Sequence, residues 1–322
     1  MPPRDPEKVL VIKLGPLRQF VLAAAAMRQI RAAHPQAHVT LLTTLPFESL
    51  AKASPYFDAV ESDGDAKGLG EWLGLIGRLR RARYDRVYDL QASRTSKAIH
   101  LGLGPVGPAW SGAGPLRGPG RAHPLDRQAA QLKAAGAWPD AAAGPGDAPP
   151  PDLSWILKTA PAERPVRDGI NRRAYVLLIP GASETPPSLR WPPERYGELG
   201  RLLRQRGFDV VIVGAPQDGD VARAIQHQVP GARDLTGGPD FARVALLGAR
   251  AAAVIGADAG LLHLASAAGA PAIVVCPKAA DPALSAPRGH VTVLQAGEMA
   301  ELPAATVAQA VDSLSPAGAR SA

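Results

Sequence analysis

The fold of this chain is decided by residues 9–44, which read VLVIKLGPLRQFVLAAAAMRQIRAAHPQAHVTLLTT. Residues 9–13 are a short run of β-branched and aliphatic side chains, which predicts a buried strand, and residues 38–43 repeat that pattern. Between them, residues 20–33 form a longer alanine-rich run that predicts a helix ending before Pro35. A strand, a helix and a second strand in this order pack as a right-handed parallel crossover, so the chain opens with a βαβ unit.

The same alternation continues along the first half of the chain and starts again in the second half. The first half adds a strand at residues 87–90 and helices at residues 47–53, 71–82, 96–103 and 125–135. The second half has strands at residues 175–179, 210–213, 252–255 and 272–276 and helices at residues 193–206, 221–228, 241–249 and 260–268. Between the halves, residues 138–168 change in composition, beginning with WPDAAAGPGDAPPPDLSW. Such a stretch has little to bury and is typical of a linker or surface loop.

We therefore expect an α/β protein with two doubly wound, Rossmann-like domains. The expected boundaries are an N-terminal domain at residues 1–150, a linker at residues 151–168 and a C-terminal domain at residues 169–322. Ligands of such sheets bind at the carboxyl ends of the strands. We therefore expect the two domains to face each other across a cleft that holds the site.

The composition limits the classes of partner. Apolar residues make up 46% of the chain, which excludes a wholly disordered protein, and one cysteine, Cys276, excludes a disulfide framework and a cysteine-cluster metal site. The 36 basic residues, 28 of them arginine, outnumber the 29 acidic ones. One explanation for this excess of arginine is the base composition of the genome. The other is a surface suited to phosphate-rich partners, because the planar guanidinium group of arginine can donate two parallel hydrogen bonds to a phosphate. Nucleic acid is not expected, since aromatic residues, at 5%, are too few for a stacking surface.

The N-terminal residues contain no long apolar run before a small-residue cleavage site, so we expect no signal peptide. The apolar run at residues 20–27 is too short to span a bilayer. We expect a cytoplasmic protein. Its basic surface leaves open a peripheral, electrostatic contact with the inner membrane.

The most informative segment for chemistry is VIGADAGLLHLA, residues 254–265. A buried strand ends there, Asp258 stands at the expected N-cap, and a helix follows. The amides at the start of that helix belong to Ala259, Gly260 and Leu261. Together with the helix dipole they can bind an anion, and Gly260 lets a phosphate approach the main chain. The alternative is an ordinary Asp-capped helix with His263 packed inside.

Two more loops leave a strand and enter a helix. The first is IPGASETPPSLRWP, residues 179–192, in which Ser183 and Thr185 can donate hydrogen bonds to a phosphate and Arg190 can add a positive charge. The alternative for this segment is a Pro-rich loop in which Trp191 fills a gap in the core. Residues 13–21, KLGPLRQFV, follow the first strand; the alternative is a plain turn. The loop at residues 13–21 does not read GxGxxG, GASET at residues 181–185 is not a GxSxG elbow, and the chain has no GxxxxGK[ST] or HExxH sequence. A dinucleotide-binding fingerprint, a P-loop and the corresponding zinc and serine hydrolase sites are therefore not supported.

Taken together, these segments resemble glycosyltransferase family nine, the ADP-heptose:lipopolysaccharide heptosyltransferase group. The resemblance covers nearly the whole chain. Besides residues 9–44, its motifs are YDRVYDLQASRTSK (84–97), WSG (110–112), HPLDRQ (123–128), PGAS (180–183), RWPPERY (190–196), DLTG (234–237) and GADAGLLHLASAAGAP (256–271). Each motif is weak alone, and their order and spacing carry the identification.

The resemblance implies a GT-B fold, with a sugar acceptor on the N-terminal domain and a nucleotide-sugar donor on the C-terminal domain. On the donor side, it implies that Asp258 contacts sugar hydroxyls, that Gly260 and its neighbouring amides hold the diphosphate, and that His263 orders the site. Ser183 and Thr185 would hold phosphate, and Asp218 or Asp220 would reach the ribose or base. The expected acceptor-binding residues are Lys13, Asp89, Gln91, Arg94 and Arg127. The implied partners are a nucleotide-diphosphate sugar and a phosphorylated lipid-linked glycan, with no metal and no cofactor.

The chain departs from the family pattern at positions that matter for catalysis. After the first strand the family carries KLGALGDF or RLSSLGDV, whose Asp is thought to be the general base. Here KLGPLRQF places Gln19 at that position and Arg18 before it, and a carboxamide cannot accept a proton at neutral pH. Leu189 stands where the family has a Lys facing the donor phosphates. Loss of a general base typically lowers the rate by about 10²–10⁴-fold.

Three functions follow from these observations. The first is an active transferase that moves a heptose or related sugar onto an envelope glycan, and the second is an impaired relative that binds a nucleotide sugar or glycan as a regulator or scaffold. Asp89 and Asp126 are the acids of the N-terminal domain to examine as substitutes for the base. The third is a Rossmann-type oxidoreductase or epimerase, for which the chain lacks the glycine fingerprint in the loop after its first strand and a clear Tyr-x-x-x-Lys pair.

Overall fold

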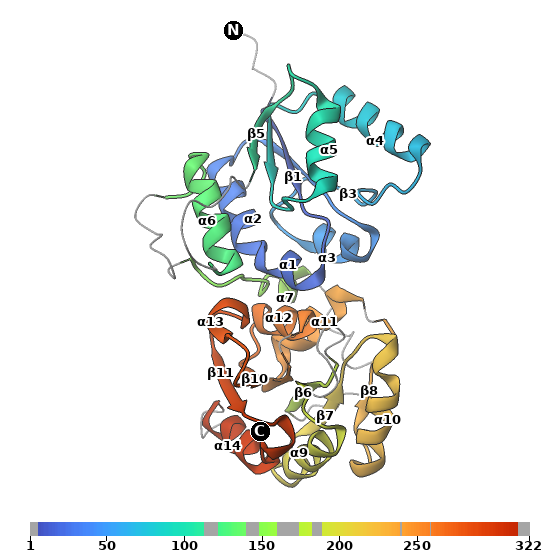
Figure 1. Ribbon diagram of the computed structural model, residues 1–322, viewed down its shortest axis with the longest axis vertical. Coiled ribbons are helices and arrows are strands. Elements are labelled where there is room, and N and C mark those ends of the chain that lie inside the picture. The colour runs from blue at the N-terminus through green and yellow to red at the C-terminus, as the bar shows by residue number, and fades with distance from the viewer. Residues whose placement is uncertain are drawn as a thin grey trace. The chain divides into compact units, whose positions relative to one another are not determined.

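A computed structural model describes residues 6–112, 122–139, 148–159, 174–181, 189–238, 240–257 and 259–314. The chain divides into two compact units, Met1–Pro151 and Asp152–Ala322 (Figure 1). Each unit is built on its own parallel sheet with helices on both faces, which confirms the α/β class with two doubly wound sheets.

The first unit contains a five-stranded parallel sheet in the order β3-β2-β1-β4-β5. Its strands are β1 (Lys8–Ile12), β2 (His38–Leu42), β3 (Ala59–Glu61), β4 (Arg86–Asp89) and β5 (Ala109–Gly112). Its helices are α1 (Leu17–Leu22), α2 (Ala24–Ala33), η1 (Leu45–Phe47), α3 (Glu48–Ala53), α4 (Leu69–Ala82), α5 (Arg94–Leu103) and α6 (Pro124–Ala134). Helices α2 and α6 lie on one face of this sheet and α4 and α5 on the other.

The apolar runs of the sequence form the core of this unit. Residues Val9 and Ile12 of β1 are fully buried, because β1 is the central strand and both of its faces are covered. Ile12 belongs to a buried cluster to which helix α4 adds Leu75 and Leu79, and burial of each such side chain contributes about 1.5–3 kcal/mol. The strand order reverses between β1 and β4, so the loops that follow these two strands flank the crevice where such sheets bind ligands.

The second unit contains a six-stranded parallel sheet in the order β11-β10-β9-β6-β7-β8. Its strands are β6 (Tyr175–Ile179), β7 (Asp209–Ile212), β8 (Arg233–Asp234), β9 (Ala253–Gly256), β10 (Ala272–Pro277) and β11 (Val291–Ala296). Its helices are α7 (Ile156–Thr159), α9 (Pro193–Gln205), η4 (Pro216–Asp218), α10 (Gly219–Gln228), α11 (Phe241–Arg250), α12 (Gly260–Ala267), α13 (Pro282–Ser285), η5 (Met299–Glu301) and α14 (Ala304–Leu314).

In this second sheet the order reverses between β6 and β9, so its crevice is flanked by the loops that follow Ile179 and Gly256. The two strands approach closely there, because a Cβ atom on Gly256 would collide with the main-chain oxygen of Ile179. Both loops are among those that the sequence singled out. The binding of a ligand at these loops stays a prediction.

Three features of the structure differ from the expectation. The predicted helix at residues 20–33 is two helices, α1 and α2, that meet at Ala23. Part of the expected linker packs on the second unit: Leu153 and Ile156 are buried, and the Leu153 amide donates to the Ala267 oxygen at 2.7 Å. The N-cap of α12 is Ala259, whose main chain is extended, and not Asp258 as the sequence predicted.

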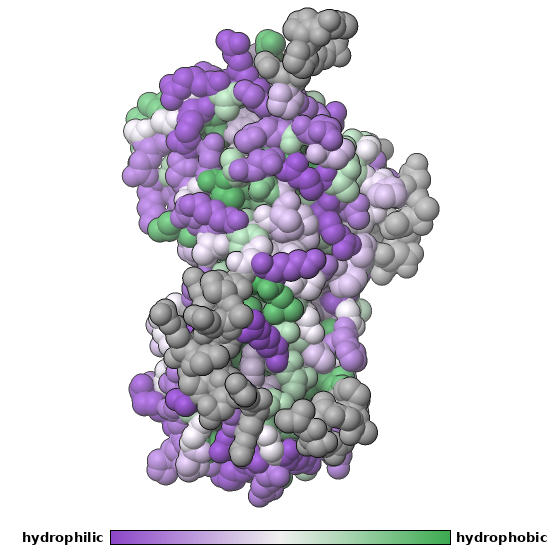
Figure 2. Space-filling model, turned by 180° about the vertical axis from the view of Figure 1, so that it is seen from behind, coloured by the Kyte–Doolittle hydropathy of each residue, from purple (hydrophilic) through white to green (hydrophobic). Residues whose placement is uncertain are grey.

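Among the described residues, no helix is long and apolar enough to cross a bilayer. The face shown in Figure 2 is mostly hydrophilic or intermediate in hydropathy, and apolar side chains form small separate groups on it.

Candidate functional site

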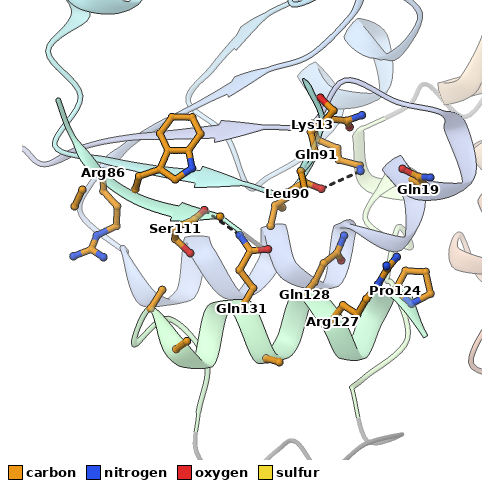
Figure 3. Close-up of a pocket in the computed structure, with 18 of the residues that line it drawn as sticks. Lys13, Gln19, Arg86, Leu90, Gln91, Ser111, Pro124, Arg127, Gln128 and Gln131 are labelled. Atoms are coloured by element: carbon orange, nitrogen blue, oxygen red, sulfur yellow. Dashed lines mark hydrogen bonds between the residues drawn. The ribbon is translucent and has the colours of Figure 1, made fainter. Parts of the chain in front are cut away.

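A pocket of about 1170 Å³ lies in the first unit, beyond the carboxyl ends of β1 and β4 and along β5 and α6 (Figure 3). It brings together four of the residues expected to be functional: Lys13, Gln19, Gln91 and Arg127. They come from the loop after β1, from α1, from the loop after β4 and from α6, so only the tertiary fold places them together.

Lys13 lies at the inner wall of this pocket and is only 2% exposed. Its Nζ atom donates a hydrogen bond of 3.0 Å to the main-chain oxygen of Leu90 (Figure 3). Burial lowers the pKa of Lys13 from 10.5 to about 8, the Asp89 carboxylate opposes the shift, and the Arg127 guanidinium adds to it. A buried lysine with a pKa near neutrality is a frequent mark of a functional site.

Asp89 ends β4 and is 4% exposed. Its Oδ1 atom accepts hydrogen bonds from the amides of Gln91 at 3.0 Å and Ala92 at 2.8 Å. The carboxylate therefore holds the turn after β4, in which Ala92 adopts a left-handed conformation with φ of 50°. The Gln91 side chain in turn accepts from the Leu14 amide at 3.1 Å, which ties this turn to the loop after β1.

Helix α6 forms the opposite wall of the pocket. Its Gln131 amide donates to the main-chain oxygen of Ser111 at 3.0 Å (Figure 3). The same amide donates to the main-chain oxygen of Asp89 at 3.0 Å, so the helix is fixed to β4 and β5. The Gln128 Oε1 atom is buried, and no described group donates a hydrogen bond to it. Neither Gln128, which was noted only within the motif HPLDRQ, nor Gln131 was predicted as a site residue, although Arg127 and Gln131 share one helix face through their i, i+4 spacing.

The lining of the pocket carries positive charge and amide groups. Its charged side chains among the described residues are Lys13, Arg86 and Arg127, and no described lining residue carries a carboxylate. Arg86 also pairs with Glu7 at 3.8 Å. Gln19 is exposed at the pocket, whereas Arg18 and Arg94 are outside the lining. Asp126 lies on α6 and is likewise outside the lining.

In the second unit, the start of α12 follows the carboxyl end of β9. Ala259 has extended main chain, with φ of −124° and ψ of 154°, and none of the described side chains caps the helix. The amides of Leu262 and His263 bond to the Ala259 oxygen at 3.0 and 3.1 Å. The amides of Gly260 and Leu261 lie in the first turn, where a helix binds anions. His263 is buried within this helix, at 1% exposure.

The other residues predicted on the donor side are not gathered in one described group. Asp218 is buried; it accepts from the Ala215 amide at 2.8 Å and packs against Gly181, so it holds the loop after β7. Asp220 is exposed and pairs with Arg223 on the same helix. Ser183, Thr185 and Asp258 lie outside the described residues.

The region before α9 shows a buried tryptophan. Trp191 is 2% exposed and donates from Nε1 to the Leu302 oxygen at 3.1 Å, while Arg190 is half-buried and Leu189 is 40% exposed. Trp191 thus anchors the residues immediately before α9 in the core. In the described part of the chain, no three His, Cys, Asp or Glu side chains are grouped as a metal site.

Comparisons with known proteins agree on one family. The model of glycosyltransferase family 9 (heptosyltransferase) matches residues 72–287. Lipopolysaccharide heptosyltransferase 2 of Escherichia coli strain K12 is 26% identical over 286 residues, which cover 83% of this chain and 82% of that protein. Its counterpart from Salmonella typhimurium strain LT2 gives the same identity and coverage.

Solved structures show the same fold. The structure of E. coli ADP-heptose LPS heptosyltransferase II superposes with a TM-score of 0.78 at 21% identity and covers 95% of this chain and 98% of its own. A family 9 glycosyl transferase from Veillonella parvula DSM 2008 superposes with a TM-score of 0.79 at 16% identity, covering 96% and 97%.

Proposed function

The chain belongs to glycosyltransferase family 9, the heptosyltransferase family, and has the GT-B fold; on that premise, we propose that it transfers a heptose or a related sugar from a nucleotide-diphosphate donor, with ADP-heptose as the first candidate. The acceptor is a lipopolysaccharide core or another envelope glycan. The observation that carries this proposal is the pocket of the first unit, whose described charged lining residues are all cations.

The chemistry of that pocket suits a phosphorylated glycan. Arg127 offers a planar fork that binds phosphate, and Lys13 adds a second cation when it is protonated. The orphan Oε1 atom of Gln128 would accept a hydrogen bond from a sugar hydroxyl, because a buried acceptor left without a donor is costly. The exposed Gln19 amide offers a donor and an acceptor to the same class of ligand.

The second unit supports binding of the donor. The start of α12 directs the amides of Gly260 and Leu261 outward, and such amides stabilise the negative charge that develops on a leaving diphosphate. We extend the family roles to Asp258, Ser183 and Thr185 as contacts to the donor sugar and phosphates, and to His263 as the residue that orders this turn. Asp218 and Asp220 remain proposed contacts to the ribose or base.

In the proposed reaction, a hydroxyl oxygen of the acceptor attacks the anomeric carbon of the donor sugar. The bond between that carbon and the diphosphate oxygen breaks, and the nucleoside diphosphate leaves with the electron pair. The hydroxyl proton passes to a base or to water. The protein binds and orients the two substrates and stabilises the charge of the leaving group.

A second candidate function is favoured by one observation. Gln19 stands where the family pattern has its carboxylate, and the described lining holds no carboxylate in its place. Leu189 also replaces the expected cation. A protein with these changes could bind the nucleotide sugar or glycan and act as a regulator or scaffold without turnover.

The test is direct. Purified protein is incubated with ADP-heptose and a lipid-linked core acceptor, and release of ADP is measured, with calorimetry to follow donor binding. Turnover that falls in the Arg127→Ala variant but not in Arg201→Ala, an exposed arginine on α9 outside the pocket, supports the transferase. Binding without turnover supports the second candidate, and neither binding nor turnover with any sugar nucleotide contradicts both.

We also propose that the protein works in the cytoplasm and meets its lipid-linked acceptor at the inner membrane. The support is the net charge of +7 and the exposed pair Leu69 and Leu73 on α4, which also carries the exposed Arg80 and Arg81. The test is flotation of the protein with anionic vesicles. Flotation that is lost at high salt, and that is weaker for the double variant Arg80→Glu with Arg81→Glu, would support the proposal. Absence of flotation at low salt would contradict it.

A further inference from the structure

We propose that the neutral amine of Lys13 is the proton acceptor in the transfer reaction, in place of the carboxylate that this chain lacks at position 19. The inference rests on the proposed function. It assigns to Lys13 a step of the chemistry itself, beyond the binding of an acidic acceptor.

The first argument is elimination within the pocket. Arginine stays protonated at all relevant pH values, and the amides of Gln19, Gln91 and Gln128 cannot take up a proton near neutrality. Serine hydroxyls and the Trp110 indole do not serve as bases by themselves. Among the described residues that line the pocket, Lys13 is therefore the side chain that can exchange a proton in the range where an enzyme works.

The neighbouring carboxylate is not available for this step. Asp89 accepts two main-chain hydrogen bonds, from Gln91 and Ala92, and is 4% exposed. Protonation would weaken both bonds and loosen the turn that lines the pocket. Asp89 is outside the lining, so its charge acts on Lys13 rather than on a ligand.

The second argument is electrostatic. Two charged groups act on the amine: β4 contributes the Asp89 carboxylate and α6 contributes the Arg127 guanidinium. Burial, helped by Arg127, outweighs the attraction of Asp89, so the pKa of Lys13 falls to about 8. A sizeable fraction of the amine is then neutral near pH 8, whereas an ordinary lysine would be almost wholly protonated.

The step balances without any other reactant. The lone pair of Nζ forms a bond to the hydroxyl proton while the acceptor oxygen bonds to the anomeric carbon, and the diphosphate leaves with the electron pair of the broken bond. Lys13 ends as an ammonium group, which the main-chain oxygen of Leu90 stabilises through the hydrogen bond of 3.0 Å. Loss of that proton to water restores the amine for the next turnover.

The decisive comparison uses Lys13→Arg. Arginine keeps a cation and hydrogen-bond donors but cannot release its proton. With ADP-heptose and acceptor at saturation, we expect kcat of the natural protein to rise with pH and level off above about 8, following the pKa of Lys13. We expect Lys13→Arg to lose this rise and to fall in kcat by about 10²–10⁴-fold.

A second variant separates a chemical role from a structural one. Gln19→Asp introduces the carboxylate of the family pattern, and in the double variant Lys13→Arg with Gln19→Asp we expect recovered kcat with a flat profile above pH 6. A merely structural Lys13 predicts no such recovery. A Lys13→Arg variant with the natural pH profile would overturn the inference while the proposed function stood. No turnover by the natural protein or by Gln19→Asp would instead overturn the proposed function.

Discussion

The Nζ atom of Lys13 donates a hydrogen bond of 3.0 Å to the main-chain oxygen of Leu90. This contact joins the residue after β1 to the residue after β4, across the point where the order of the first sheet reverses. Sheets of this type bind their ligands at that point. The Lys13 side chain and the turn that follows β4 therefore hold each other in place at the edge of the pocket.

The stability of the protein should depend on pH through Lys13. The pKa of this residue is lowered from 10.5 to about 8 in the folded protein, so between these pH values the unfolded chain binds a proton that the folded chain has lost. The free energy of unfolding therefore rises with pH across that window and is lowest, for this group, below pH 8. The shift corresponds to about 3 kcal/mol. The measurement is the free energy of unfolding of the natural protein minus that of Lys13→Met, obtained by urea denaturation at pH 7.5 and at pH 10.5. Because only the natural protein has this titrating group, the value at pH 10.5 should be higher by an amount of this order. A constant difference would contradict the prediction.

The charge of Arg127 should be visible in the titration of Lys13. Arg127 helps to lower the pKa of the lysine, so Arg127→Gln should raise it above about 8. The measurement is an NMR titration of the lysine side-chain carbons, with the Lys13 signal assigned from its loss in Lys13→Arg. Arg81→Gln, at an exposed position on α4, serves as the control and should leave the titration unchanged. An unmoved midpoint in Arg127→Gln would remove Arg127 from the electrostatics of the site.

Gln131 should matter for stability more than its position on a surface helix indicates. Its amide donates two hydrogen bonds of 3.0 Å, to Asp89 and Ser111, and Gln131→Ala leaves both oxygens without these donors. We expect a loss of about 1–3 kcal/mol and faster hydrogen exchange in α6. Gln36→Ala, at an exposed position of the same unit, should change little. Equal effects of the two substitutions would show that water replaces the Gln131 bonds at no cost.

Gly256 should tolerate no side chain. A Cβ atom there would overlap the main-chain oxygen of Ile179, so Gly256→Ala must push β6 and β9 apart at the crevice of the second sheet. We expect a loss of about 1–3 kcal/mol in thermal or urea unfolding. Gly297→Ala is the matched control, because nothing lies within 4 Å of the added atom, and its effect should be near zero. A neutral Gly256→Ala would mean that the strand ends separate freely.

The predictions from sequence succeeded where burial enforces a strong local pattern. Strand β6 has the bounds that the sequence predicted, Tyr175–Ile179, because all five of its residues are buried. The edge strands β3 and β8 were missed, since they have only three and two residues and carry no such pattern. The break at Ala23 was missed as well, because it lies inside an alanine-rich run with no local stop signal.

The sequence by itself determined the alternation of strands and helices, the two doubly wound sheets, the family and the absence of a carboxylate at Gln19, because these follow from local pattern and residue identity. Only the tertiary structure decided how the charges of Asp89 and Arg127 act on Lys13. It committed the Asp89 carboxylate to the amides of Gln91 and Ala92, brought Arg127 from a distant helix to the same pocket, and enclosed Lys13 so that its pKa falls to about 8. Protonation depends on solvent exclusion and on charges far apart in the chain, and no local pattern of residues encodes either.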